Sequence, residues 1–224
     1  MKKPELIVHN YQKRLEGLYL ERIRIFNLSK YENDLRKKGF SLIAGIDEVG
    51  RGSLAGPVVA AAVILPEQFF VPYLKDSKKL TPQKRAKLYS VVLEKVVSIG
   101  IGIVSAQLID QINIRQATFL AMERAILDLK RMPNYLLVDG FKIPQLNLSQ
   151  TALIKGEDKS ISIASASIIA KVYRDNMMIQ YDQKYPQYHF KKNKGYGTEE
   201  HLAALKKYGP SAIHRKTFKG VVES

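Results

Sequence analysis

The sequence predicts an α/β fold in which a mixed β-sheet is flanked by helices. Apolar runs bounded by glycine and proline, at residues 41–47 and 58–65, are typical of strands that are covered on both faces. Later apolar runs alternate with longer segments of helical periodicity, such as residues 114–129. Strands first, then strands alternating with helices, favour one α/β domain with a mixed sheet.

Residues 1–40 are predicted to form a helical N-terminal extension, ahead of a domain over residues 41–224 with a helical C-terminal part. Residues 5–38 are charged and helix-prone, and we expect Gly17 to divide them into two or more helices. Gly39 ends the segment. The basic and tyrosine side chains of the extension either contact nucleic acid or form the solvated face of a packing appendage, and the sequence leaves both open.

The first helix of the domain is predicted from Thr81 to about residue 97, with Thr81 as its N-cap and Pro82 in its first turn. Residues 99–104, which include Gly100 and Gly102, form the third expected strand. An amphipathic helix follows over residues 114–129.

Two short strands, residues 135–138 and 151–154, precede a long helix over about residues 162–185. The long helix opens on small side chains, which favour close packing against a sheet or a site. Thr198 is the expected cap of a last helix, which runs to about residue 208.

The composition favours a polyanionic partner. The chain has 224 residues, 36 Lys and Arg against 21 Asp and Glu, and a net charge of +15. An inert basic surface is the alternative, and charge alone does not separate DNA, RNA and anionic membrane. The absence of cysteine excludes disulfides and thiolate metal sites. The longest apolar run, residues 58–65, is too short to span a bilayer, so we expect a soluble cytoplasmic protein.

Three acidic clusters stand at the ends of predicted strands: Asp47-Glu48, Asp139 and Glu157-Asp158. Functional groups gather at strand ends in α/β sheets. Converging carboxylates without histidine or cysteine favour Mg²⁺ or Mn²⁺ over zinc. Two such ions, roughly 3.5–4 Å apart, would activate a water and stabilise the leaving oxygen in phosphodiester cleavage.

The first acidic pair is followed by Gly50-Arg51-Gly52. Because neighbouring strand residues point to opposite faces, we predict that the strand ends or bulges at Asp47-Glu48. Glycines beside an arginine let backbone and guanidinium approach a phosphate or sugar. The sequence contains no G-x-x-x-x-G-K-[ST] motif, which disfavours a nucleotide triphosphatase.

The segment 185–196 mixes lysines with aromatic residues. Such a mixture either binds phosphates and stacks on bases or forms a charged loop with core aromatics. The four histidines show no metal-ligand spacing, and His214, beside Arg215, is predicted to be a basic surface residue.

From residue 43 onward the sequence resembles bacterial ribonuclease HII, of the type 2 ribonuclease H family. The shared motifs, in the order that the family shows, are AGIDEVGRG (44–52), LAGPV (54–58), DSKKL (76–80), NI (113–114), VDG (138–140), KGEDKS (155–160), IIAKV (168–172), NKGYGT (193–198) and HR (214–215).

The resemblance implies a ribonuclease H-like fold and an endonuclease that cleaves the RNA strand of RNA–DNA hybrids. It also implies nicking 5′ of single ribonucleotides in duplex DNA, leaving 3′-hydroxyl and 5′-phosphate ends, in ribonucleotide removal and primer removal. Its catalytic residues and ligands for two Mg²⁺ or Mn²⁺ ions would be Asp47, Glu48, Asp139 and Glu157. The family usually has aspartate at the fourth position, so Asp158 stays open as the alternative to Glu157.

For substrate binding, the resemblance implies that Gly50, Arg51 and Gly52 read the ribose 2′-hydroxyl through backbone atoms. Tyr196 would stack on the sugar at the RNA–DNA junction. Weaker candidates for holding the DNA backbone are Ser77, Lys78 and Asn113. Ser53 stands where the family commonly has proline, and we expect it to loosen the turn without removing the chemistry.

Two competing functions remain. One is a ribonuclease HIII-like nuclease that cleaves hybrids only, against which the glycine-arginine turn and Tyr196 argue. The other is a non-catalytic basic nucleic-acid-binding protein, which leaves the acidic clusters unexplained. The expected partners are RNA–DNA hybrids and duplex DNA containing ribonucleotides, with no membrane contact, and the expected state is a monomer.

Overall fold

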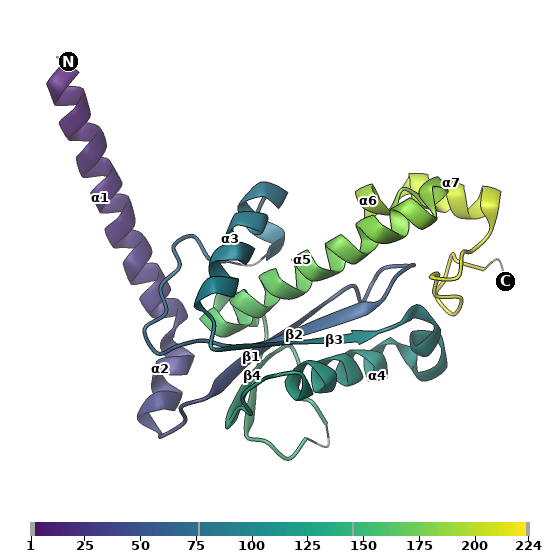
Figure 1. The fold of residues 1–224 in the computed structure, drawn as a ribbon, viewed down its shortest axis with the longest axis horizontal. Helices are drawn as coiled ribbons and strands as arrows, with labels where there is room; N and C mark the ends of the chain where they lie inside the picture. The colour runs from purple at the N-terminus through teal and green to yellow at the C-terminus, as the bar shows by residue number, and fades with distance from the viewer. Residues whose placement is uncertain (1–2, 76, 145, 223–224) are drawn as a thin grey trace.

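The computed structural model describes residues 3–75, 77–144 and 146–222, so Asp76 of the predicted 76–80 motif lies outside the described residues. Its centre is a five-stranded sheet in the order β3-β2-β1-β4-β5 (Figure 1). The elements are β1 (Ile43–Val49), β2 (Val58–Ile64), β3 (Ser98–Val104), β4 (Tyr135–Asp139) and β5 (Gln150–Leu153). β1 pairs antiparallel with β2 and parallel with β4, which confirms the predicted mixed sheet.

Helices cover both faces of the sheet (Figure 1). α3 (Pro82–Lys95) and α5 (Ile161–Lys184) lie on one face, and α4 (Ala106–Leu127) lies on the other. Gly45 of β1 lets α5 approach closely, because a Cβ there would clash with the backbone of Ser162. Gly102 of β3 likewise lets α4 approach closely, because a Cβ there would clash with the backbone of Ala121.

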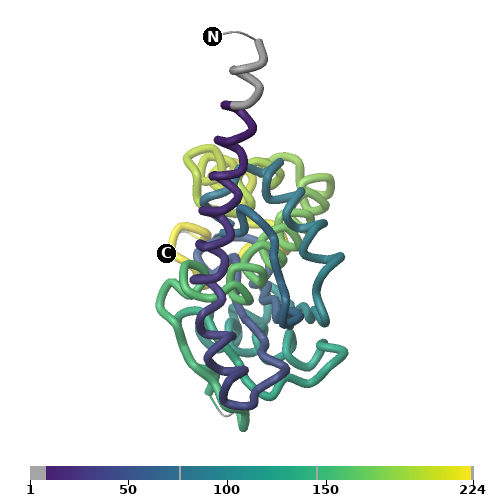
Figure 2. The backbone as a smooth tube through the Cα atoms, turned by 90° about the vertical axis from the view of Figure 1, so that its left-hand side faces the viewer, coloured from purple at the N-terminus to yellow at the C-terminus, as the bar shows by residue number. Residues whose placement is uncertain are grey.

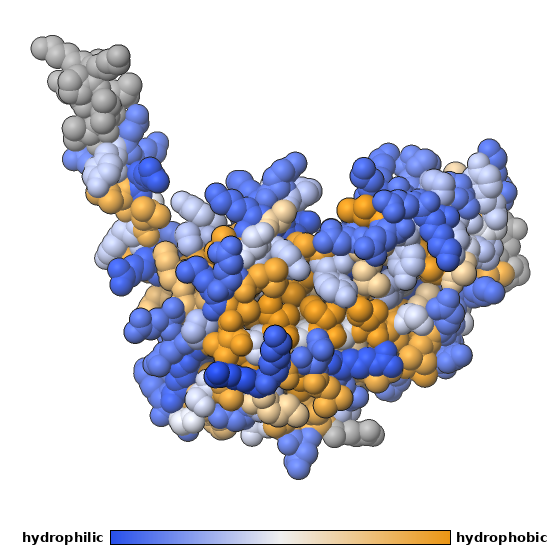
Figure 3. Space-filling view, in the orientation of Figure 1, coloured by the Kyte–Doolittle hydropathy of each residue, from blue (hydrophilic) through white to orange (hydrophobic). Residues whose placement is uncertain are grey.

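The edge strand β3 is protected by side chains of α4 and the residue after it. The Asp128 carboxylate accepts a hydrogen bond from Ile101 N at 2.9 Å, and Arg124 Nη1 donates to Ile103 O at 2.6 Å. In the orientation of Figure 1, apolar side chains gather around β3 in the middle of the molecule (Figure 3). The two polar contacts occupy backbone groups that would otherwise offer a pairing edge.

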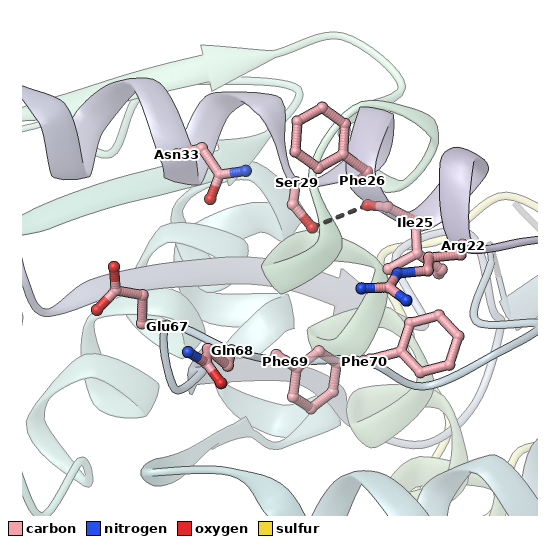
Figure 4. A pocket seen from close by; sticks show the side chains of 9 residues that line it. All are labelled: Arg22, Ile25, Phe26, Ser29, Asn33, Glu67, Gln68, Phe69 and Phe70. Atoms are coloured by element: carbon pink, nitrogen blue, oxygen red, sulfur yellow. Dashed lines mark hydrogen bonds between the residues drawn. The ribbon is translucent and has the colours of Figure 1, made fainter.

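The N-terminal extension consists of two helices, α1 (Lys3–Leu28) and α2 (Lys30–Lys37). α1 projects away from the body of the molecule (Figures 1 and 2). The prediction that Gly17 breaks the helix is wrong, because α1 continues through it; a single glycine costs a helix only about 1 kcal/mol. The break falls at Ser29, whose hydroxyl donates to Ile25 O at 2.9 Å. This bond lies in a pocket between α1, α2 and residues 67–70 (Figure 4).

The extension is anchored by a buried carboxylate. Glu32 of α2 is 1% exposed, and its Oε1 accepts hydrogen bonds from Ser160 Oγ at 2.6 Å, Ser162 Oγ at 2.6 Å and Ser162 N at 3.0 Å. These donors stand at the start of α5, where backbone N–H groups attract negative charge. Glu32 therefore ties the extension to the helix that packs on β1.

Most predicted boundaries agree with the structure within two residues, and Thr81 and Thr198 are N-caps as predicted. The helix predicted from residue 114 begins earlier, at Ala106, and is kinked at Asn113. The predicted strand break at Asp47-Glu48 is wrong. β1 keeps regular pairing with β2 as far as Val49.

Short elements complete the chain. They are the 3₁₀ turns η1 (Ser77–Lys79), η2 (Gly156–Asp158) and η3 (Pro186–Tyr188), and the helices α6 (Phe190–Asn193) and α7 (Glu199–Tyr208). Within the described residues, no helix combines the length and apolar character that crossing a membrane requires.

We predict that Glu32→Ala lowers the free energy of unfolding by about 2–3 kcal/mol, because buried donors at the start of α5 lose a charged acceptor. Urea unfolding at neutral pH measures this. Asp34→Ala is the matched control, since the Asp34 carboxylate is half exposed and lies 3.9 Å from Lys37. It should change stability by less than about 0.5 kcal/mol. Equal losses in both variants would contradict the anchoring role.

Candidate active site

The three predicted acidic clusters lie together at one edge of the sheet. Asp47 and Glu48 are near the carboxyl end of β1, and Asp139 ends the adjacent parallel strand β4. Glu157 lies in η2, shortly after β5, which runs parallel to β4. Parallel strands bring their carboxyl ends to the same edge, so residues distant in sequence become neighbours.

Asp47 and Glu48 reach this edge without a bulge. Pairing of β1 with β4 ends at Ile46↔Val138, while pairing with β2 continues to Val49↔Val59. The acidic pair therefore stands where β1 has a neighbour on one side only. Successive strand side chains point to opposite faces, yet both acidic side chains line one pocket here.

Asp47 is held by polar contacts on an almost fully buried side chain, which is 8% exposed. Its Oδ1 accepts a hydrogen bond from Glu48 N at 2.7 Å, and the Ser167 hydroxyl of α5 also bonds to the carboxylate. The Ser167 hydroxyl lies 2.9 Å from that of Ser77. Ser77 is predicted from the sequence to hold DNA. Its buried hydroxyl contacts Ser167, the residue that bonds to Asp47. Sequence reasoning missed Ser167, whose only signal was its place in the small-residue start of α5.

Burial raises the pKa values of the clustered acidic side chains, and neighbouring carboxylates add to the rise at Asp47 and Asp139. Burial raises the pKa of Asp47 well above its usual range, and the nearby Glu48 and Asp139 carboxylates add to the rise. Burial also raises the pKa of Glu48, against the opposing effect of the Arg51 guanidinium 3.3 Å away. These shifts mean that the ionised cluster is destabilised by burial and repulsion, which a bound cation would relieve.

Asp139 connects the first acidic pair to η2. Its Oδ1 accepts a hydrogen bond from Gly156 N at 2.7 Å, and its carboxyl also hydrogen-bonds with the Glu157 side chain. Burial raises the pKa of Asp139, while the Gly156 bond opposes the rise. Asp158 is oriented differently, because its exposed carboxylate pairs with Lys79 Nζ at 2.7 Å. Of the two alternatives for the fourth carboxylate, Glu157 is the one beside Asp139.

The donor set of this edge suits a hard divalent cation. All the clustered side chains offer oxygen, as Mg²⁺ and Mn²⁺ require. Among the residues that the structure describes, no group of three or more acidic or histidine side chains is placed so that it could hold a metal ion. An open acidic edge nonetheless fits Mg²⁺, which keeps several waters and binds one or two carboxylates together with substrate phosphates.

The Gly50-Arg51-Gly52 turn directly follows β1. Gly50 has φ +90°, and Arg51 and Gly52 are exposed. The prediction that Ser53 loosens this turn is wrong. Its buried hydroxyl donates to Gly50 O at 2.9 Å and accepts from Arg174 Nη2 at 2.7 Å, so the side chain braces the turn.

Tyr196 lies on the same pocket as the acidic pair, although it is far away in the sequence. Tyr196 is 38% exposed, whereas Tyr188 and Phe190 from the same predicted segment are buried in the core. Lys171 of α5, which sequence reasoning did not single out, also borders the pocket. The full lining is Asp47, Glu48, Val49, Ser77, Lys78, Ser167, Lys171 and Tyr196.

Two predicted residues have other surroundings. Asn113 is exposed at the kink of α4, outside that lining, and its Oδ1 caps the second half of the helix at Arg115 N and Gln116 N. The prediction of His214 as a surface residue is wrong. Its Nε2 lies 2.9 Å from that of His201, and burial and His201 lower the pKa of His214 to about 4.

Comparison with known proteins identifies the family. The family model described as Ribonuclease HII matches residues 44–221. A Ribonuclease HII of Bacillus cytotoxicus is 52% identical over 212 residues, which are 95% of this chain and 82% of the relative.

Two solved structures share the fold. The crystal structure of ribonuclease H2 from Pyrococcus horikoshii OT3 has a TM-score of 0.68 and 26% identity, over 80% of this chain and 94% of that one. Bst-RNase HIII in complex with Mn²⁺ is similar in fold alone, with a TM-score of 0.62 and 18% identity over 81% of this chain and 68% of that one.

The family match spans every acidic residue gathered at the sheet edge, together with the turn and the tyrosine beside them. The chain therefore belongs to the ribonuclease HII family and is a ribonuclease H, an endonuclease that acts on RNA–DNA substrates.

Proposed function

We propose that this enzyme cleaves the RNA strand of hybrids and nicks duplex DNA 5′ of a single embedded ribonucleotide, leaving 3′-hydroxyl and 5′-phosphate ends. The observation that carries the proposal is one pocket bordered by the acidic pair Asp47-Glu48 and by Tyr196. The pocket brings carboxylates that could hold the catalytic cation next to an aromatic ring that could recognise the cleavage site. We further propose that the enzyme acts as a monomer in ribonucleotide removal and primer removal.

In the catalytic half of the proposal, Asp47, Glu48, Asp139 and Glu157 hold two Mg²⁺ or Mn²⁺ ions. When bound, such ions supply Lewis-acid activation of a water and stabilise charge on the leaving oxygen. The protein's part is to keep its carboxylates ionised and oriented. Ser167 and Glu48 N fix Asp47, and Gly156 N fixes Asp139. The Mn²⁺ complex of the structurally similar ribonuclease HIII is consistent with a cation of this class.

In the recognition half, the turn at residues 50–52 reads the ribose 2′-hydroxyl, the group that distinguishes RNA from DNA. The carbonyls of Gly50 and Arg51 accept hydrogen bonds from Arg215 on the inner side of the turn. Arg51 and Gly52 remain exposed on the outer side. The half-exposed ring of Tyr196 is proposed to stack on the sugar at the junction.

Basic side chains would hold the phosphates around the cut. Lys78 and Lys171 border the pocket, where an ammonium group can neutralise a phosphate. Ser77 contributes through its bond to Ser167, and exposed Asn113 would contact the DNA backbone outside the pocket. A non-catalytic binding protein has no use for acids beside these lysines, because unscreened carboxylates repel phosphates.

We predict that Asp47→Asn and Asp139→Asn each reduce cleavage of a hybrid by more than about a hundredfold, beyond the effect usual for groups that only support metal ligands. Each change removes a charge that holds a cation. Hybrid binding, measured by fluorescence anisotropy in EDTA, should change by less than about threefold because the basic groups remain.

Asp158→Asn is the matched control for these variants, because its carboxylate points to Lys79 instead of Asp139. It should retain activity within about twofold, since an exposed ion pair contributes little. Glu157→Gln, one residue away, should lose activity as the aspartate variants do. Cleavage by both Asp47→Asn and Asp139→Asn at the normal rate would refute the proposed cation site.

We predict that Tyr196→Ala lowers kcat/KM about tenfold or more on a duplex with one ribonucleotide, the loss expected for one stacking contact. The loss on a continuous hybrid should be smaller, and the melting temperature should stay close to that of the wild type, since the ring is partly exposed. Tyr208→Ala is a control on another exposed tyrosine. Equal activity of wild type and Tyr196→Ala on the single-ribonucleotide duplex would remove the stacking role and favour a hybrid-only nuclease.

A further inference from the structure

Two arginines are buried behind the proposed recognition turn. Arg174 of α5 and Arg215, in the segment after α7, are both 0% exposed. Within the described part of the chain, neither guanidinium forms an ion pair with a carboxylate. Burial lowers the pKa of both, and the neighbouring Arg174 charge helps to lower that of Arg215 to about 9. Burying two like charges without a carboxylate partner destabilises a fold unless hydrogen bonds compensate for the lost hydration.

Arg215 is bonded to the inner side of the turn. Its Nη2 donates to Gly50 O at 2.6 Å, and its Nη1 donates to Arg51 O at 2.8 Å. Nε and Nη2 also donate to Gly56 O, at 3.1 and 2.9 Å. One guanidinium therefore holds the carbonyls at both ends of the loop that begins at Gly50.

Arg174 joins the same loop to the segment that carries Tyr196. Its guanidinium donates to Ser53 Oγ at 2.7 Å, to Ala55 O at 3.1 Å and to Pro57 O at 2.9 Å. Nη1 donates to Lys194 O at 2.9 Å, two residues before Tyr196, and the guanidinium lies 5.8 Å from the tyrosine ring.

The glycine at position 50 fits this arrangement for two reasons. Its φ of +90° is a conformation that side-chain-bearing residues rarely adopt. A Cβ at this position would also clash with the Arg174 guanidinium. The turn therefore packs against the Arg174 side chain so closely that only glycine fits at position 50.

We propose that Arg174 and Arg215 are positioning residues that set the enzyme's discrimination between ribonucleotide and deoxyribonucleotide. Arg215 keeps the carbonyls of Gly50 and Arg51 inward, which leaves the outer side of the turn to the sugar. Arg174 fixes the separation between the turn and Tyr196. Neither arginine touches substrate, and the inference rests on the proposed recognition of the 2′-hydroxyl.

Arginine suits this task better than lysine, because its rigid fork presents five donors in one plane. A lysine at position 215 would keep the positive charge but could not bond Gly50 O, Arg51 O and Gly56 O in their present geometry. Arg215→Lys therefore separates the geometric contribution of the fork from the effect of charge alone.

The experiment measures binding in Ca²⁺ to two duplexes of the same sequence, one all DNA and one with a single ribonucleotide. The ratio of their Kd values is the discrimination. We expect Arg215→Lys to reduce this ratio about tenfold, mainly by weakening the ribonucleotide complex, with all-DNA binding nearly unchanged. Ser53→Ala, which removes one link between Arg174 and the turn, is a milder second variant that should reduce the ratio in the same direction.

Glu32→Ala serves as the stability control, because it is expected to destabilise the fold at the other end of α5 without touching the turn. It should leave the ratio unchanged. A wild-type ratio near one would overturn the proposed 2′-hydroxyl recognition and this inference with it. A normal wild-type ratio that Arg215→Lys and Ser53→Ala both preserve would overturn the positioning role alone. If Arg215→Lys does not fold, Ser53→Ala decides.

Discussion

The gathering of carboxyl groups at one partly buried edge of the sheet is the constraint on which the rest of this structure depends. Asp47, Glu48 and Asp139 each have a raised pKa, because burial disfavours their ionised forms. The Glu48 carboxylate adds repulsion that raises the pKa of Asp47 and of Asp139 further. Such a cluster is retained at a cost to stability, and a hard cation is the partner that removes the cost. The parallel pairing of β1, β4 and β5 provides the proximity, and hydrogen bonds from Glu48 N and Gly156 N orient the acids.

Helix α5 links this acidic edge to the other functional parts. Its start receives Glu32 from the N-terminal extension, and Ser167, in its first third, contacts Asp47. About one turn further along, Lys171 borders the pocket, and about two turns further along, Arg174 braces the proposed recognition turn. The close approach of α5 to β1 at Gly45 sets the distance between these groups. A single rigid helix thus aligns the groups proposed for cutting with those proposed for recognition.

The sheet and most helices could be predicted from sequence, because apolar runs and caps such as Thr81 and Thr198 report local preferences. The errors came from an overestimated effect of one glycine and from tertiary contacts. Gly17 does not end α1, since one glycine costs too little to stop a long helix. β1 needs no bulge at Asp47-Glu48, because its pairing with β4 stops at the residue before the pair. No local pattern indicates where a neighbouring strand ends.

The residues of the candidate site also fall into those that sequence could predict and those that it could not. The acidic residues could be named because charged side chains at strand ends have a sequence signal. Ser167 and Arg174 had no such signal, and the motif HR at residues 214–215 did not indicate that both side chains are buried. His214 is buried by pairing with His201, and Arg215 by the backbone carbonyls of a loop distant in sequence. The surroundings of these residues are created by the fold. In a chain with many basic residues, sequence alone predicts that a basic side chain is on the surface, because the distant carbonyls that bind it cannot be inferred.

The most direct test of the proposed activity is one nicking assay on duplex DNA that contains a single ribonucleotide, with Mg²⁺, with Mn²⁺ and with EDTA. We expect one nick on the 5′ side of the ribonucleotide when either cation is present and none in EDTA, because the acidic edge requires a cation to act. Cleavage that persists in EDTA would contradict the proposed cation site. Absence of a nick with either cation, on a preparation that cleaves a continuous hybrid, would contradict the proposed recognition of a single ribonucleotide.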